Sequence, residues 1–426
     1  MMKQKYFFII AVWFCTLTEL WAQEDSIITV TPTSWERTIT NKLQEVMKQA
    51  DRDHYFTGLC VYDLTDGKTL FGHNQNKMMR PASTQKLTTA IAALDRLGAE
   101  HTYSTHIYRT GTVTTDSLGK KTLGGDIYIT GDFDPLLRMT DFQEMVSLLK
   151  TDSITTINGK IYADVSMKDT LLLGMGWCWD DKNPLLTPLM LQGDASTSSI
   201  SRIGYYHPEK YLTQGVVDLL RKNGIKVTTN TSTGVATYKG GGKLILTLKH
   251  TVDDVLLSMM KKSNNKHAES MFFQLGNETG KHCSTKDCIS QVMQTVRKAV
   301  AVFTGVSVSD ADVADGSGLS LYNYATPRME VALLAYAFKH TNIYDYLYPS
   351  LPIAGVDGTL SHRMQQGSAY NNVHAKTGTV TGVSCLAGYA KASNGHMLAF
   401  SIMNNGVKET SQAHALQDKI CNIITK

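Results

Sequence analysis

The sequence predicts an α/β (α+β) protein in which an antiparallel sheet flanked by helices is interrupted by an inserted, mostly β domain. Hairpin signals near both ends of the chain and short β-prone runs in its middle give this prediction. The 426 residues, 42% hydrophobic and 19% charged, suffice for two or three domains of roughly 150 residues each. We expect a signal peptide at 1–22, a discontinuous main domain at 23–101 and 250–426, and the insertion at 102–249.

The main domain is expected to take its strands from both ends of the chain. These strands span residues 58–63, 69–72, 383–392 and 396–403. An Asp-Gly turn separates the first two and an Asn-Gly turn the last two, and both arrangements are typical of β-hairpins. Helical spacing of apolar residues predicts a helix over 35–50 and a closing helix over 409–425.

Three short motifs follow one another along the chain. They are Ser-Thr-Gln-Lys at 83–86, Ser-Asn-Asn at 263–265 and Lys-Thr-Gly at 376–378. Together they offer a serine nucleophile, two lysines and a second serine, which can perform acyl transfer without a histidine. The serines of the first two motifs, Ser83 and Ser263, are 180 positions apart. This separation is longer than one compact domain usually places between catalytic groups that must touch. This spacing agrees with an insertion, whose β-prone runs include 127–130 and 243–247.

The first motif needs its context, because the pattern SxxK is common. It starts at Ser83, Ser117, Ser147, Ser258 and Ser263, whereas SxN and KTG each occur once. Ser83 alone follows a proline and precedes apolar residues at helical spacing that end at a glycine, Gly98. Ser83 is therefore expected in the first turn of a helix.

Lys86 is the candidate proton acceptor for Ser83. A spacing of three puts both side chains on one face of a helix, one turn apart. Lys86 can accept the proton only when neutral, and the reference lysine pKa is about 10.4. The positive end of the helix dipole, and Lys376 if it folds in beside Lys86, should lower this pKa.

The other two motifs are expected in different settings. Ser263 interrupts a helical pattern that covers 252–275, and Lys376 lies in a β-prone run over 372–380. Gly378 would let a ligand backbone approach that strand closely. The N–H of Thr379 is then a candidate oxyanion donor alongside the N–H of Ser83.

Composition excludes several other classes of function. The net charge of +4 is too small to indicate nucleic-acid binding, and no cluster of lysines with interleaved aromatics is present. The sequence has no HExxH motif, no CxxC pair and no glycine-rich phosphate loop. We therefore expect no metal and no cofactor.

The first 22 residues resemble a signal peptide. Lys3 and Lys5 precede the apolar stretch 6–17, and a small residue, Ala22, follows at the expected cleavage site before Gln23. Export would make the protein periplasmic or secreted, and no later segment has about 18 uninterrupted apolar residues that could cross a membrane. Six cysteines remain outside this segment. Cys283 and Cys288 are a local pair that either forms a disulfide or stays as two thiols.

Beyond the three motifs, further stretches carry a family resemblance. They are Gly-Trp-Cys-Trp-Asp-Asp at 176–181, Asp-Gly-Ser-Gly-Leu-Ser at 315–320 and Leu-Pro-Ile-Ala-Gly-Val-Asp-Gly-Thr-Leu at 351–360. With them the chain resembles the D-alanyl-D-alanine carboxypeptidase/endopeptidase branch of the penicillin-binding proteins, the class C or penicillin-binding protein 4 type. A large insertion between the first two motifs is a hallmark of that branch. Residues 182–190 match the family only loosely, which leaves recognition of the peptide stem open.

The resemblance implies a transpeptidase/β-lactamase-like catalytic domain. Such an enzyme hydrolyses the terminal D-Ala-D-Ala bond, or the D-linked cross-bridge, of peptidoglycan through an acyl-enzyme at Ser83. Its partners would be stem peptides ending in D-Ala-D-Ala, with β-lactam antibiotics as covalent inhibitors.

The resemblance also implies a role for each remaining motif residue. Lys86 would accept the proton of the nucleophile, and Ser263 would relay a proton. Asn265 would bind the amide of the acyl donor, and Lys376 with Thr377 would hold the substrate carboxylate. The substrate-binding set would also include the glycine and threonine that follow them, Gly378 and Thr379.

By composition alone, the other matching stretches are expected to be structural. Residues 315–320 and 357–358 are turn sequences, and Trp177 and Trp179 are expected to be a buried pair. Two alternative functions stay open. A serine β-lactamase would carry a glutamate motif for deacylation, and a non-catalytic peptidoglycan-binding protein would normally lose one of the motif residues.

Overall fold

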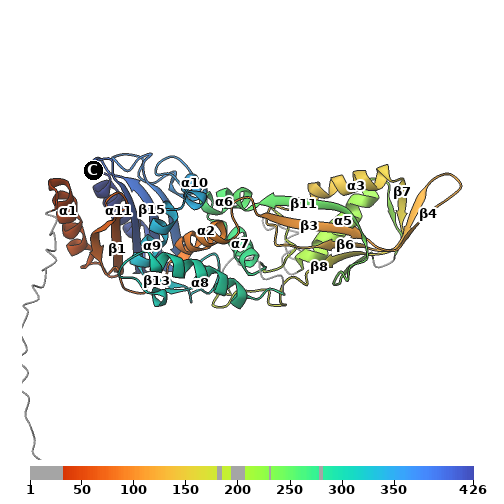
Figure 1. Ribbon diagram of the computed structural model, residues 1–426, viewed down its shortest axis with the longest axis horizontal. Helices are drawn as coiled ribbons and strands as arrows, with labels where there is room; N and C mark the ends of the chain where they lie inside the picture. The colour runs from red at the N-terminus through yellow and green to blue at the C-terminus, as the bar shows by residue number, and fades with distance from the viewer. Residues whose placement is uncertain (1–31, 180–184, 193–206, 230–231, 278–281) are drawn as a thin grey trace, which may run out of the picture.

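The computed structural model describes residues 32–179, 185–192, 207–229, 232–277 and 282–426. The predicted signal peptide lies outside the described residues. The molecule is elongated, with the first helix and the C-terminus in the body at one end and the insertion at the other (Figure 1). None of the described helices has the length and apolar character needed to cross a membrane.

The main domain is built on a five-stranded antiparallel sheet. Its strands, in spatial order, are β14 (His374–Val380), β15 (Gly382–Lys391), β16 (Met397–Val407), β1 (Phe56–Asp63) and β2 (Lys68–His73). Both predicted hairpins are confirmed: β1 pairs with β2 and β15 with β16. Their turns use glycines at positive φ, 70° at Gly67 and 89° at Gly395. Strands from the two ends of the chain therefore meet at the β1–β16 pair.

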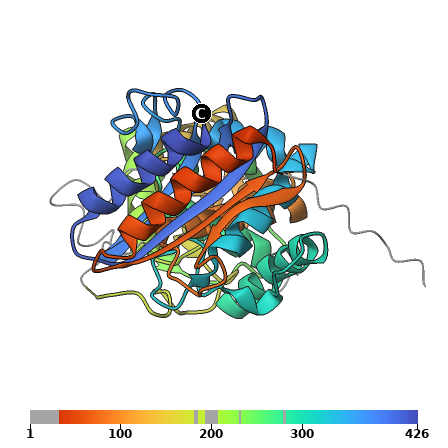
Figure 2. The same cartoon turned by 90° about the vertical axis from the view of Figure 1, so that its left-hand side faces the viewer.

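Helices cover both faces of this sheet. The two terminal helices, α1 (Ser34–Ala50) and α11 (Thr410–Ile424), lie side by side across one face (Figure 2). Leu59 and Val61 of β1 pack against them, whereas Cys60 between these two residues packs into the core on the other face. This alternation follows from the two-residue period of a strand.

The other face carries the helices that position the three motifs. They are α2 (Gln85–Arg96), α6 (Val252–Lys261), α7 (Asn265–Asn277), α8 (Thr285–Ala301), α9 (Pro327–Phe338) and α10 (Thr341–Ser350). Short elements accompany these helices: the 3-10 turns η1 (Ala82–Thr84) and η3 (Val308–Asp310), and the strands β12 (Ala311–Asp312) and β13 (Tyr324–Ala325). A further 3-10 turn, η4 (Gly358–Leu360), places Leu360 in the core under α1 and α11. All ten residues of α7 from His267 to Gly276 are buried, as expected for a helix enclosed by others. The predicted interruption at Ser263 is confirmed, because it separates α6 from α7.

The described part of the insertion contains two sheets. The first has the order β10 (Thr233–Val235), β8 (Ile161–Asp164), β6 (Ile127–Thr130), β3 (Thr102–Arg109) and β11 (Lys243–Thr251). The second has the order β4 (Thr112–Thr115), β5 (Lys121–Gly124), β7 (Ile154–Ile157) and β9 (Lys226–Val227). Thr102 of β3 pairs with Thr251 of β11, so the chain enters and leaves the insertion at adjacent positions.

The insertion also contains helices that the sequence analysis did not anticipate. They are α3 (Phe142–Thr151) and α5 (Pro208–Lys222), with a short 3-10 turn, η2 (Met139–Asp141), before α3. Phe142 and Val146 of α3 and Val216 of α5 are fully buried in a core shared with the strands. Other residues of the insertion, Phe133, Leu186 and Met190, pack instead into the core around α2 and α7 of the main domain.

The cysteine pair adopts the second of its two predicted states. Cys283 and Cys288 are both buried and both free thiols, with their Sγ atoms 3.5 Å apart. They pack against Gly276 of α7, where a Cβ atom would lie within 2.6 Å of either sulfur.

Candidate active site

The structure places Ser83 in η1, a single 3-10 turn that leads directly into α2. The sequence predicted a position within the first helical turn, whereas α2 itself begins two residues later at Gln85. Ala82 in front of the serine has a φ of 47°. A non-glycine residue adopts this left-handed conformation only when its surroundings hold it, and such residues cluster at active sites.

Two glycines allow neighbouring segments of the chain to pack closely against η1. A Cβ at Gly378 of β14 would lie 2.6 Å from the carbonyl oxygen of Pro81 and 3.1 Å from the amide nitrogen of Ser83. A Cβ at Gly318 would lie 1.8 Å from the carbonyl oxygen of Ala82. Only glycine permits either contact, so the glycine of the KTG motif brings β14 against the nucleophile.

Lys86 lies one turn after Ser83 and is completely buried. Its Nζ donates to Ser83 Oγ at 2.9 Å, to Asn265 Oδ1 at 2.8 Å and to the carbonyl oxygen of Ser317 at 2.7 Å. An ammonium group has three protons to donate, and these acceptors use all three. The predicted contact between Ser83 and Lys86 is present.

Burial lowers the pKa of Lys86 to about 8, because a low-dielectric interior disfavours the charged form. The carboxylates of Asp315 and Glu269 act in the opposite direction and raise this pKa. The direction agrees with the sequence analysis, but the cause differs. Desolvation is the largest effect, and the repulsion between the two lysines lowers the pKa of Lys376.

Lys376 and Ser263 form the second half of the site. Lys376 is completely buried in β14, and its Nζ donates to Ser263 Oγ at 2.8 Å and to the carbonyl oxygen of Thr377 at 2.7 Å. Burial, and then the charge of Lys86, hold the pKa of Lys376 well below its usual value. Ser263 has a φ of 54°, again a left-handed conformation at a candidate catalytic residue.

Asn265 connects the two halves. It is the first residue of α7, two positions after Ser263, and its Oδ1 accepts from Lys86. The sequence analysis assigned Asn265 to the amide of the substrate. The structure adds a contact with the proton acceptor that the motif alone did not predict.

β14 is an edge strand, so one side of it is open beside Ser83. Near its start, the N–H of Ala375 bonds the carbonyl oxygen of Pro352 on this outer side. Residues two positions apart in a strand direct their N–H groups the same way. The N–H groups of Thr377 and Thr379 therefore point along the same outer edge. Thr377 Oγ1 also lies 2.7 Å from Oγ1 of Thr359, a hydroxyl that the sequence analysis did not single out.

Residues 315–320 have more than the structural role predicted for them, because the carbonyl oxygen of Ser317 contacts Lys86. Trp177 of the insertion donates its Nε1–H to Asp315 Oδ2 at 2.7 Å. Trp179 is 94% exposed, so the expectation of a buried tryptophan pair is wrong. Trp177 joins the insertion to this loop through its indole, and the carbonyl oxygen of Met175 accepts from Ser320 Oγ at 2.7 Å.

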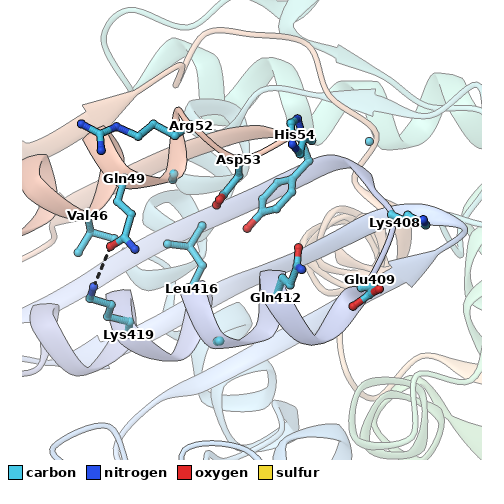
Figure 3. A pocket seen from close by; sticks show the side chains of 14 residues that line it. Val46, Gln49, Arg52, Asp53, His54, Lys408, Glu409, Gln412, Leu416 and Lys419 are labelled. Atoms are coloured by element: carbon cyan, nitrogen blue, oxygen red, sulfur yellow. Dashed lines mark hydrogen bonds between the residues drawn. The ribbon is translucent and has the colours of Figure 1, made fainter.

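Two other features lie away from this site. A cavity of about 590 Å³ lies between α1 and α11, on the opposite face of the sheet from α2 (Figure 3). Its lining includes Gln49 and Lys419, which hydrogen-bond at 3.5 Å, and none of the predicted site residues. Within the described residues, Asp63, Asp66 and His396 lie close enough together to hold a metal ion. Asp63 already bonds the His396 ring, at 2.7 Å, and the N–H of Asp66.

Comparison with known sequences identifies the family. The sequence model of the D-Ala-D-Ala carboxypeptidase 3 (S13) family matches residues 39–190 and 189–426. The chain belongs to this family. Membership confirms the predicted class, the serine D-alanyl-D-alanine carboxypeptidases and endopeptidases among the penicillin-binding proteins.

Curated S13 relatives match most of the chain. The D-alanyl-D-alanine carboxypeptidase of Actinomadura sp. (strain R39) is 27% identical over 430 residues, covering 82% of this chain and 78% of the relative. The D-alanyl-D-alanine carboxypeptidase DacB of Haemophilus influenzae is 25% identical over 419 residues, covering 82% and 85%.

Solved structures confirm the predicted fold class. Penicillin-binding protein 4 of Haemophilus influenzae matches with a TM-score of 0.75 at 23% identity, over 88% of this chain and 97% of that one. A predatory peptidoglycan endopeptidase of Bdellovibrio bacteriovorus matches with a TM-score of 0.56 at 19% identity, over 87% and 93%. Both share the mixed α/β architecture with helices flanking the sheet.

Proposed function

We propose that Ser83 is the nucleophile and Lys86 its general base. The observation that carries this proposal is the 2.9 Å contact between Lys86 Nζ and Ser83 Oγ, combined with a lysine pKa of about 8. Neutral Lys86 takes the proton of Ser83 while Oγ attacks the carbonyl carbon of the terminal D-Ala-D-Ala bond. The tetrahedral intermediate then collapses to an acyl-enzyme.

The leaving D-alanine must receive a proton. Ser263 Oγ accepts a hydrogen bond from Lys376, which leaves its own proton free to donate. We assign Ser263 the relay that protonates the leaving amine, with Lys376 as the next proton source behind it. Water then attacks the acyl-enzyme, and the same groups act in reverse to release the shortened peptide.

The negative charge that develops on the carbonyl oxygen needs two donors. The N–H of Ser83 lies in η1, just before α2, and the N–H of Thr379 points along the open edge of β14. Each donor of this kind contributes about 2.7–4 kcal/mol to the transition state of acyl transfer.

The substrate carboxylate lies, in this proposal, against Thr377 and the charge of Lys376. The Thr377 hydroxyl already exchanges a hydrogen bond with Thr359. In that bond one hydroxyl donates its proton and the other accepts, so the accepting hydroxyl keeps its own proton free to donate to an anion. Asn265 remains the proposed partner of the amide in the acyl donor.

The proposed substrates are peptidoglycan stem peptides ending in D-Ala-D-Ala and, for endopeptidase action, D-linked cross-bridges. β-Lactams are the proposed covalent inhibitors, supported by the solved complex of Haemophilus influenzae penicillin-binding protein 4 with a β-lactam. We also propose export to the periplasm or the exterior through residues 1–22. N-terminal sequencing of the exported protein tests this, since a chain that keeps residue 1 contradicts it.

Mass spectrometry of defined muropeptides incubated with the purified protein tests the activity. We expect loss of one alanine from pentapeptide stems, and cleavage of cross-linked dimers if the endopeptidase reaction occurs. Ser83→Ala should abolish both, whereas Ser117→Ala, which alters another SxxK match, should change neither. Intact pentapeptide with the wild-type protein would favour a β-lactamase or a non-catalytic binding protein instead.

A further inference from the structure

A buried carboxylate on α7 lies behind the proposed general base. Glu269 is one turn after Asn265 and only 1% exposed. Its carboxylate accepts hydrogen bonds from the N–H of Ser317 at 2.8 Å and the N–H of Gly316 at 3.3 Å. The carbonyl of the same Ser317 is the acceptor that bonds Lys86. Glu269 and Lys86 thus hold opposite sides of one short backbone segment.

The rest of that segment is fixed just as firmly. Thr89, one turn after Lys86 on α2, donates its hydroxyl to the carbonyl oxygen of Gly316 at 2.7 Å. Asp315 accepts from the N–H of Gly318 at 2.7 Å and from the N–H of Ser320 at 2.6 Å. It also accepts from the side chains of Asn323 and Trp177.

Two buried carboxylates without adjacent arginines are costly, because the interior penalises charge. Burial, and then Asp315, raise the pKa of Glu269 to about 8. The charged groups that face Lys86 are Asp315, Glu269 and, from β14, Lys376. Two such acids lower the free energy of unfolding unless a nearby cation compensates them. The cation that both acids face is the ammonium group of Lys86.

We propose that Glu269 is a positioning residue for Lys86. It holds the backbone of 315–320 so that the carbonyl of Ser317 fixes the Lys86 side chain toward Ser83, and, once ionised, its carboxylate favours the protonated lysine. This inference rests on the proposed function, in which Lys86 is the base.

The test measures the rate of acylation by a fluorescent penicillin from pH 5 to 10. Because the base must be neutral, the wild-type rate should rise with pH through the pKa of Lys86. In Glu269→Gln the plateau of the acylation rate at high pH should fall at least several-fold. A glutamine amide has one oxygen, so it cannot accept from the N–H groups of both Gly316 and Ser317 as a carboxylate does. The rise should also move to lower pH, because the variant lacks a charge that raises the pKa of Lys86.

Two further variants separate positioning from charge and from stability. Thr89→Val loosens the same segment without changing any charge, so it should lower the plateau and leave the rise at the wild-type pH. Asp95→Asn alters a hydrogen-bonded carboxylate on α2 that is about 14 Å along the helix axis from Lys86. It should lower the melting temperature and leave both plateau and profile unchanged.

A Glu269→Gln profile that matches wild type, or a lower plateau with no shift, would overturn the inference. The second result would show a purely structural role. Failure of the proposed function looks different, since wild-type protein would then stay unlabelled or Ser83→Ala would still be labelled.

Discussion

The main domain and the insertion contribute unequally to the site. The three acceptors of Lys86 come from η1, from α7 and from the loop at 315–320, and those of Lys376 come from Ser263 and β14. All belong to the main domain. The insertion has a core of its own and meets the loop at 315–320 through Trp177, which bonds Asp315, and through the carbonyl oxygen of Met175, which accepts from Ser320.

This difference separates the catalytic contacts from the insertion. Acylation by a small β-lactam should depend on the main domain far more than on the insertion. The predictions below test that separation, beginning with the largest expected loss of acylation.

Lys86→Arg should lower the acylation rate by about 10²- to 10⁴-fold, the usual contribution of a general base. The charge is kept, but a guanidinium with a pKa above about 12 cannot accept the proton of Ser83. Stopped-flow measurement with a fluorescent penicillin gives the rate. Lys120→Arg, in an exposed SxxK match of the insertion, is the control. A near wild-type rate for Lys86→Arg would assign the proton to another group.

Lys376→Ala should lower acylation roughly 10- to 100-fold, because a hydrogen bond to a charged group contributes about 1.5–3 kcal/mol. Removal of a neighbouring cation should also raise the pKa of Lys86. A base with a higher pKa becomes neutral at higher pH, so the rise of the rate profile should move upward. An unchanged rate together with an unchanged profile would remove Lys376 from the site.

Trp177→Phe should lower the free energy of unfolding by about 1.5–3 kcal/mol, since it deletes the indole N–H that bonds Asp315. Acylation should fall far less than in the two lysine variants, because Asp315 keeps its other donors. Urea denaturation and the acylation rate are the measurements. Trp179→Phe, at an exposed position, should change neither. Equal losses in both variants would contradict a specific role for the indole.

Ile129→Val, in the core of the insertion, should have the smallest effect on acylation. Loss of one buried methylene lowers the free energy of unfolding by about 0.5–1.5 kcal/mol. The acylation rate of the folded protein should stay at the wild-type value. A clear fall in that rate would show that the insertion core is coupled to the nucleophile.

Local patterns predicted the residues of the site because the backbone setting of each motif is local, although the contacts that join the motifs span 113 and 179 positions. The spacing of Ser83 and Lys86, the helix break at Ser263 and the strand of Lys376 are all set within a few residues. The role of Gly378 could also be anticipated, since a glycine in a strand often marks a close approach.

Other features depend on contacts between distant segments. Glu269 meets Ser317 across 48 positions, and Thr359 meets Thr377 across 18. No periodicity marks such pairs. Nor does sequence alone decide which tryptophan of Trp-Cys-Trp is covered. The helix α3 is a different case, because Phe142, Met145, Val146 and Leu149 recur at helical spacing and could have been recognised.

The most direct measurement is the mass of the protein after incubation with benzylpenicillin, followed by mapping of the modified peptide. We expect a single addition on the peptide that contains Ser83, present in Ser117→Ala and absent in Ser83→Ala. An addition on any other peptide, or one that persists in Ser83→Ala, would contradict the assignment of the nucleophile on which the account depends.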